Sequence, residues 1–253
     1  MKKWVYCLLV SILCLCGCSQ RAEERETVSS NNRTEETIYA GSIAAVKEET
    51  AFLTGEAGTG LIALSLDGLE ITDEAGNKMK KEDLSGGMLV HVTYDGAIME
   101  TYPERLSKPT KLSVIKREKD ILGLYRQVIW DIYETDQALN SGKYLALDFT
   151  KVSRLSDTQK QALMYLLSDD FQKESFMGTM ESLKKDGYVD GENLVFQDGV
   201  LITLEDESED EEEEFSFHVQ KWKSGKGAIL WNACKATWNG NAYSYEIGEM
   251  GVS

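Results

Sequence analysis

The sequence predicts two folded units: a small all-β barrel at residues 38–118 and, at residues 119–253, an α+β domain with helices packed on an antiparallel sheet. Short apolar runs separated by turn residues fill the first stretch, which is typical of a closed barrel of short strands. After Glu118, apolar residues recur every three or four positions, the period of a helix. Several strand candidates then end the chain, and helices followed by a strand meander predict the α+β class.

The clearest strand of the barrel covers residues 88–94, where apolar and other side chains alternate. Asp95-Gly96 follows it, and this dipeptide favours a tight two-residue hairpin turn. Such a turn would pair His91 with Glu100 on the returning strand. We expect five or six short strands of this kind.

Several turn and core segments of residues 38–118 resemble the small OB-like barrels of Gram-positive bacterial lipoproteins. The resemblance implies a fold and carries over no catalytic residue, because these positions shape turns and fill the core. The segments are Gly41-Ser42-Ile43, Ile71-Thr72-Asp73, Leu84-Ser85-Gly86-Gly87 and Val92-Thr93-Tyr94-Asp95-Gly96.

Three helices are predicted in the second unit. The first starts at Ile121 and stops before Asn140-Ser141-Gly142, a cluster of turn residues. Ser156 and Gln159 have the spacing of a capping box and predict a second helix. A short third helix covers residues 179–185. The strand candidates are residues 144–149, 194–196, 200–204, 215–222, 228–238 and 242–247.

The N-terminus has the organisation of an export signal. Two lysines precede a short apolar stretch, which is too short to span a bilayer, and Leu15-Cys16-Gly17-Cys18 ends it. This tetrapeptide resembles a bacterial lipobox, with Cys16 where alanine or serine is usual. The resemblance implies that residues 1–17 are a signal peptide and that Cys18 carries the lipid. The alternatives are an ordinary signal peptide cut elsewhere and an uncut anchor.

Residues 18–37 are almost wholly polar and are predicted to form a disordered tether. After cleavage only Cys18 and Cys234 remain, so neither an intrachain disulfide nor a cysteine-based zinc cluster is expected. An exported chain without disulfides fits a Gram-positive envelope. The localisation predicted is therefore the extracytoplasmic face of the cell membrane, with lipid anchoring through Cys18.

The chain is strongly acidic, with 43 Asp and Glu against 27 Lys and Arg and a net charge of -16. This excess argues against nucleic-acid binding, which needs a basic surface. Residues 205–214 hold much of the excess, and we interpret them as a solvated acidic loop between two strands. They lack the spacing of a calcium loop, so neither a metal nor another cofactor is predicted.

Catalytic residues are sparse. Neither G-x-S-x-G nor a P-loop occurs. Cys234 and His218 could in principle form a thiol–imidazole pair, although a buried structural cysteine is the commoner case. His91 is interpreted as structural. Asp148 ends a predicted strand, where α/β enzymes place catalytic groups, but the predicted fold is not α/β.

Aromatic residues concentrate in the last strands. Strict alternation predicts that Trp231 faces opposite Trp238 and opposite Cys234, and that Tyr243 and Tyr245 share a face. An aromatic sheet concavity could hold a sugar ring or a peptide, but the same rings could simply fill the core. The candidate ligand-binding residues are Trp222, Trp231, Trp238, Tyr243 and Tyr245.

These features favour a surface-anchored lipoprotein that acts as a non-catalytic binding or accessory module at the cell envelope. Its partners would be the membrane, through the lipid on Cys18, and an extracellular protein or glycan. The alternative is an envelope hydrolase whose site is assembled only by the fold, with His91, His218 and Cys234 as its best residues.

Overall fold

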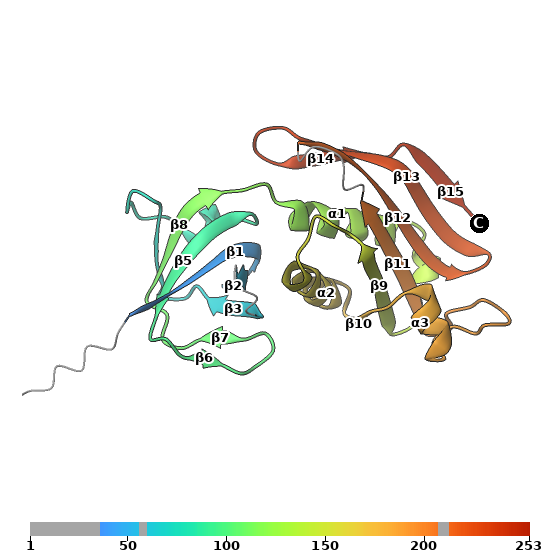
Figure 1. Ribbon diagram of the computed structural model, residues 1–253, viewed down its shortest axis with the longest axis horizontal. Helices are drawn as coiled ribbons and strands as arrows, with labels where there is room; N and C mark the ends of the chain where they lie inside the picture. Colours follow the sequence, from blue (N-terminus) through green and yellow to red (C-terminus); the bar gives the residue numbers. More distant parts are fainter. Residues whose placement is uncertain (1–35, 56–59, 207–212) are drawn as a thin grey trace, which may run out of the picture. The chain divides into compact units, whose positions relative to one another are not determined.

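Two large β-sheets and three α-helices organise the described part of the chain (Figure 1). The computed structural model describes residues 36–55, 60–206 and 213–253. The predicted signal peptide, Cys18 and nearly all of the tether lie outside these residues. Residues Glu35–Ser253 form one compact unit.

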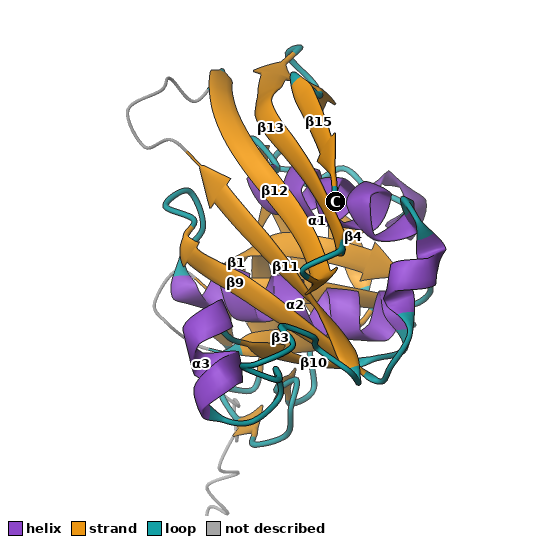
Figure 2. Ribbon diagram, turned by 90° about the vertical axis from the view of Figure 1, so that its right-hand side faces the viewer, coloured by secondary structure: helices purple, strands orange, loops and turns teal. Residues whose placement is uncertain are grey.

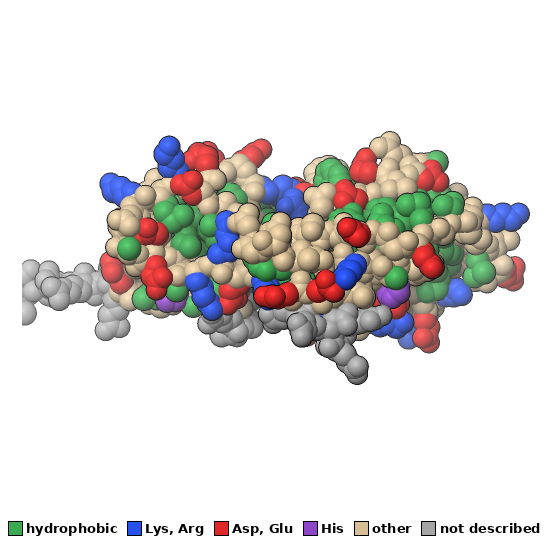
Figure 3. All heavy atoms as spheres, turned by 90° about the horizontal axis from the view of Figure 1, so that it is seen from above, with side chains coloured by type: hydrophobic (Ala, Val, Ile, Leu, Met, Phe, Trp, Pro, Cys, Tyr) green, Lys and Arg blue, Asp and Glu red, His purple; other side chains and the backbone are tan. Residues whose placement is uncertain are grey.

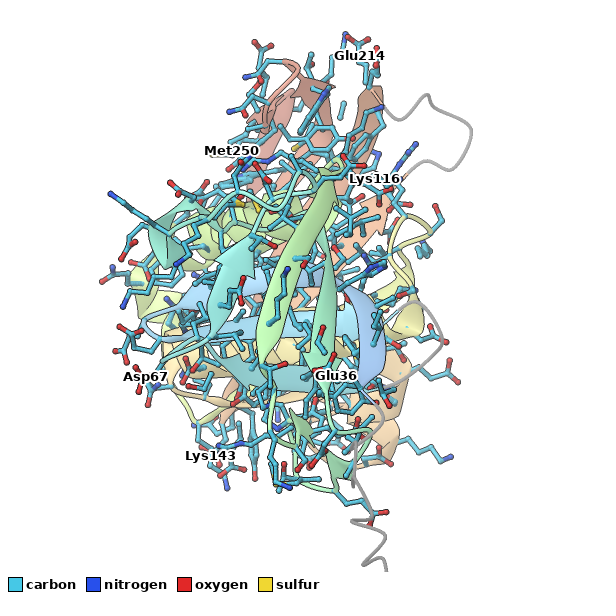
Figure 4. All side chains as sticks on the ribbon, turned by 90° about the vertical axis from the view of Figure 1, so that its left-hand side faces the viewer. Glu36, Asp67, Lys116, Lys143, Glu214 and Met250 are labelled. Atoms are coloured by element: carbon cyan, nitrogen blue, oxygen red, sulfur yellow. The ribbon has the colours of Figure 1, made fainter. Side chains whose placement is uncertain are left out.

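The first sheet has six strands in the order β3-β2-β1-β5-β8-β4. Figure 4 looks onto this sheet. All its neighbours are antiparallel except β4 and β8. The strands are β1 (Thr37–Lys47), β2 (Thr50–Gly55), β3 (Leu61–Ser65), β4 (Glu70–Thr72), β5 (Met88–Tyr94) and β8 (Lys111–Arg117), with a 3-10 turn at Lys81–Asp83.

The predicted alternation of β5 is confirmed, because Met88, Val90, Val92 and Tyr94 are all buried. The predicted hairpin after it is wrong. β5 pairs with β1 and β8, whereas the short strand β6 (Ile98–Met99) pairs with β7 (Arg105–Leu106). β1 and β8 are much longer than the two-residue β6 and pair with β5 in its place. His91 therefore lies opposite Ala40 and Ser113 and not opposite Glu100.

The second sheet has seven strands in the order β10-β9-β11-β12-β13-β14, with β15 also pairing with β13. Figure 2 shows it face-on. β9 is parallel to both β10 and β11, and the remaining pairs are antiparallel. The strands are β9 (Tyr144–Lys151), β10 (Glu174–Met177), β11 (Gly199–Asp206), β12 (Glu214–Ser224), β13 (Gly227–Trp238), β14 (Tyr243–Glu246) and β15 (Glu249–Val252).

All three predicted helices are present as α1 (Ile121–Glu134), α2 (Asp157–Phe171) and α3 (Met180–Lys185). A 3-10 turn at Gln137–Asn140 follows α1. The predicted capping box of α2 is also confirmed, because the Ser156 hydroxyl accepts from the Gln159 amide and the Gln159 side chain accepts from the Ser156 amide. These contacts satisfy two amides that the first turn of a helix leaves free.

The predicted fold class, a small OB-like barrel followed by an α+β domain with helices packed on an antiparallel sheet, is wrong. Strands hold 47% of the described residues and helices only 20%. The second sheet is mixed, and α2 contacts β1, β2 and β3 of the first sheet as well as β9 and β10. The parallel pairing arises because α2 brings the chain back to the end of the sheet at which β9 begins, so that β10 runs in the same direction as β9. Local hydrophobic pattern does not reveal such a crossover.

One hydrophobic cluster contains residues of both sheets and both long helices. Phe52 of β2 belongs to it, together with Ile129 of α1, Leu163 of α2 and Phe217 of β12. Burying each such side chain stabilises the fold by about 1.5–3 kcal/mol. The predicted boundary near residue 118 falls between β8 and α1.

An ion cluster also links the first sheet to the helices. Asp170, near the end of α2, accepts two hydrogen bonds of 2.7 Å from the Arg126 guanidinium of α1. Its Oδ1 also accepts from Lys47 Nζ of β1 at 2.7 Å. The Asp170 side chain is only 4% exposed, so these bonds compensate for its lost hydration.

The acidic segment joins β11 to β12. Glu205 and Asp206 end β11 and Glu214 begins β12, whereas residues 207–212 lie outside the described part of the chain. Among the helices that the structure describes, none has the length and apolar character needed to cross a membrane.

Candidate functional site

The structure separates the five predicted aromatic residues into three environments. Trp231 is 3% exposed and belongs to the large core cluster. Trp222 packs against a different cluster, formed around Leu183 of α3. Tyr243 and Tyr245 are half-buried at the edge strand β14, and Trp238 touches Tyr243 with ring centroids 5.1 Å apart.

The alternation predicted for β13 is wrong because the strand contains a β-bulge. Phe217 pairs with Cys234 and Val219 pairs with Trp231, so two steps along β12 match three along β13. Ala233, inside the bulge, has a φ of 46°. The extra residue returns Trp231 and Cys234 to the same buried face. Trp238 follows the alternation of Cys234 and so shares that face too.

The two tyrosines of β14, Tyr243 and Tyr245, form an aromatic wall that packs against core phenylalanines. The ring of Tyr243 lies 5.6 Å from that of Phe215, and the ring of Tyr245 lies 5.9 Å from that of Phe217. Tyr245 Oη donates a 2.6 Å hydrogen bond to Asp131 Oδ2 on α1. Burial, followed by this bond and the Asp131 charge, raises the pKa of Tyr245 above its usual value. The wall is therefore fixed before any ligand arrives.

A cavity of about 370 Å³ lies in front of this wall. It is bounded by the end of β8, the first turns of α1, the loop before β5 and the turn before β14. Among its lining residues are Arg117, Asp120, Gln127, Asn241, Tyr243 and Tyr245.

Asp120 caps α1 at one side of the cavity. Its Oδ1 accepts a 2.8 Å hydrogen bond from the Gly123 amide. Burial raises the pKa of its carboxyl group, although this bond and the charges of Arg117 and Arg126 act in the opposite direction. Gly86 and Gly123 make room for the carboxylate, since a Cβ on them would lie 2.0 Å and 2.2 Å from Asp120 Oδ2.

Planar polar groups form the other sides. Arg117 donates to Asn241 Oδ1 at 3.1 Å and to Ser85 Oγ at 2.6 Å, which joins β8 to the turn before β14. Gln127 Nε2 donates to Asp131 Oδ1 at 2.8 Å, so one carboxylate orients both Gln127 and Tyr245. Flat rings beside amide, carboxylate and guanidinium groups match the alternating apolar faces and hydroxyl groups of a sugar.

The sequence missed the contributions of Arg117, Asp120 and Gln127. They come from β8 and α1, more than a hundred residues before the tyrosines, and nothing local marks them as ligand-binding. Gly123, three residues after Asp120, indicates close approach of a side chain but not a ligand site.

The three residues best suited to a hydrolase are not brought together. Cys234 is fully buried in the core, where burial raises the pKa of its thiol. His218 lies on the other face of the sheet, where its Nδ1 accepts from the Ala233 amide at 3.3 Å. His91 is exposed on β5 of the first sheet. Within residues 36–55, 60–206 and 213–253, no cluster of three or more His, Cys, Asp or Glu side chains could hold a metal ion.

Neither a protein-family model, nor a curated protein, nor a solved structure matches this chain. A proposal for the function therefore has to be argued from the geometry of the chain itself.

Proposed function

We propose that this protein is a non-catalytic, lipid-anchored module of the bacterial cell envelope that binds a neutral saccharide in the cavity beside Tyr243 and Tyr245. The observation that carries the proposal is a cavity of about 370 Å³ that is lined on one side by the two tyrosines of β14 and on the others by planar polar groups. This volume lies within the roughly 300–1,000 Å³ typical of small-molecule sites.

The tyrosines supply the apolar part of recognition. Both rings are half-buried and held by Phe215, Phe217 and Asp131, so binding need not order them. A fixed aromatic surface lowers the entropic cost of binding, and it packs well against the C–H face of a sugar.

The polar groups favour a saccharide without net charge. Arg117 and Asp120 bring one positive and one negative charge to the lining, and Gln127 and Asn241 add neutral amides. Amides and guanidinium groups can each contact two neighbouring hydroxyl groups, which gives orientation as well as affinity.

Binding can be tested by calorimetry on the full chain with the N-acetylglucosamine trimer as the probe. Arg117→Met removes the guanidinium but keeps most of the apolar stem, and we expect a Kd about tenfold higher, equivalent to about 1.4 kcal/mol. The matched control is Lys116→Met, on the neighbouring exposed residue labelled in Figure 4. Equal affinities for the wild type and both variants would contradict a saccharide site here.

The anchoring part of the proposal rests on the lipobox-like segment that ends at Cys18. Cells fed a clickable palmitate should label the wild-type protein and leave Cys18→Ala unlabelled. Equal label on both proteins would exclude the lipid anchor and leave the saccharide site to be judged by calorimetry.

A further inference from the structure

The parallel strands of the second sheet have connections on opposite faces. α2 joins β9 to β10, and its Leu163 and Leu166 pack in the same cluster as Leu147 of β9. α3 lies between β10 and β11, and its Leu183 packs with Ala146 of β9 in another cluster. Figure 1 shows α2 and α3 on opposite sides of β9. The carboxyl ends of β9 and β10 therefore form a topological switch point.

A cavity of about 500 Å³ lies at this point. Leu147 and Phe149 from the end of β9 and Met177 from the end of β10 supply its apolar surface. The first turns of α2 and α3 line its other sides. Ligands of sheets with parallel strands bind in the crevice outside the carboxyl ends, where successive connections diverge.

Charged groups of both signs line the same cavity. They are the carboxylates of Asp148 and Asp157 and the ammonium of Lys160. Asp148 Oδ1 accepts from the Thr150 amide at 3.1 Å and from the Thr150 hydroxyl at 2.6 Å. Across the described residues, no hydrogen bond or ion pair engages Asp148 Oδ2 or the side chains of Asp157 and Lys160. These groups are thus available to a ligand.

We propose that this cavity binds an α-amino acid with an apolar side chain. Its ammonium group would lie near Asp148 and Asp157, its carboxylate near Lys160, and its side chain against Phe149 and Met177. A zwitterion can pair with both signs of charge, and hydrogen bonds between ionised groups are shorter and stronger than those between neutral groups.

Ligands of a single charge fit less well. A simple amine would leave the Lys160 ammonium beside a like charge. A simple carboxylic acid would place its anion among the carboxylates of Asp148 and Asp157. Like charges at close range oppose binding, so both single-charge analogues should be weaker ligands.

Calorimetry on the full chain with three probes of similar shape tests the proposal: leucine, 3-methylbutylamine and 4-methylpentanoate. We expect leucine to bind at least tenfold more tightly than either analogue. Asp157→Asn and Lys160→Gln should each weaken leucine binding at least fivefold. The matched control is Lys184→Gln, in the last turn of α3 and outside the lining, which should bind leucine like the wild type.

Asp157 and Lys184 are exposed and Lys160 is half-buried, so the variants should unfold close to the wild-type temperature, which circular dichroism can verify. No measurable leucine binding at millimolar concentration overturns the proposal. So does equal affinity for the three probes, or leucine binding that neither Asp157→Asn nor Lys160→Gln weakens.

Discussion

The two long helices each form one wall of a cavity, but the polar groups of the two cavities differ in what they already contact. We call the cavity beside Tyr243 and Tyr245 the α1 cavity and the cavity at the ends of β9 and β10 the α2 cavity. In the α1 cavity, Arg117, Gln127 and Tyr245 form hydrogen bonds to neighbouring residues. In the α2 cavity, Asp157 and Lys160 have no such partner among the described residues. A preorganised aromatic wall suits a neutral ligand that binds by its shape. Charged groups without partners suit a ligand that carries charges of the opposite sign.

The difference between the two cavities follows from the direction of the strands that form them. Antiparallel strands joined by short turns leave sheet edges and faces for binding, and the α1 cavity lies at the edge strand β14. Parallel strands all end at one side of the sheet, where the next helix begins, so the α2 cavity collects side chains from the ends of two strands and the starts of two helices. Each cavity therefore depends on how its helix is anchored.

Asp170→Ala should give the largest loss of stability, because it removes the carboxylate that ties α2 to Arg126 and Lys47. We expect the free energy of unfolding to fall by about 3 kcal/mol, since two cations then lose their buried partner. Urea unfolding measures the loss, and the control Asp169→Ala, at an exposed neighbour, should lose less than about 1 kcal/mol. Asp169 also contacts Lys47, but it is half exposed. A loss of less than about 1 kcal/mol in Asp170→Ala would show that the buried carboxylate does not anchor α2.

The same carboxyl group predicts an acid-sensitive fold. Burial alone would raise the pKa of Asp170, but the hydrogen bonds and charges of Arg126 and Lys47 outweigh it and lower the pKa below its usual range. Its stabilisation is present above the unfolded pKa of about 3.9 and is lost as the pH falls through the lower folded value. Asp170→Asn should therefore flatten the decrease in stability that we expect below about pH 4.

Lys221→Met tests the anchoring of α1 and should cost about 2 kcal/mol, through the carbonyl groups it leaves without a donor. The fully buried Lys221 of β12 donates to the carbonyl oxygens of Tyr133, Thr135 and Asp136 at 2.7, 2.7 and 3.0 Å. A cation at this end of α1 also complements the helix dipole. Wild-type stability in Lys221→Met, measured in urea, would mean that water replaces the ammonium without cost.

Tyr245→Phe should have the smallest effect on stability, about 1 kcal/mol, because it removes a single hydrogen bond to Asp131. It should also loosen Gln127, which shares that carboxylate, and so weaken saccharide binding while leaving leucine binding unchanged. A loss of leucine binding would show that the two cavities are coupled. Calorimetry with both probes measures each effect.

Local signals predicted several elements, although the strand predicted at residues 194–196 is absent and β10 and β15 were not predicted. The capping box at Ser156, the alternation of β5 and the period of α1 each depend on near neighbours, and each is confirmed. Features set by distant partners were missed. The bulge at Ala233 places Trp231 and Cys234 on one face of β13, where strict alternation predicts opposite faces. The sequence of β9 likewise gives no local sign of its parallel partners.

The two cavities show the same limit. The sequence singled out Tyr243 and Tyr245 but not Arg117 or Gln127, because the fold alone brings α1 beside β14. Asp148 lies near the end of a parallel strand and lines a cavity, whereas a sheet predicted to be antiparallel gives no reason to expect a site there.

Side-chain amide signals in a ¹⁵N-resolved NMR titration test most directly whether the chain has two independent sites. Gln127 and Asn241 report on the α1 cavity, and Gln161 reports on the α2 cavity. The N-acetylglucosamine trimer should shift the amides of Gln127 and Asn241 alone, and leucine should shift that of Gln161 alone, whichever ligand is added first. Shifts of all three amides with either ligand, or of none with both, would contradict two separate sites.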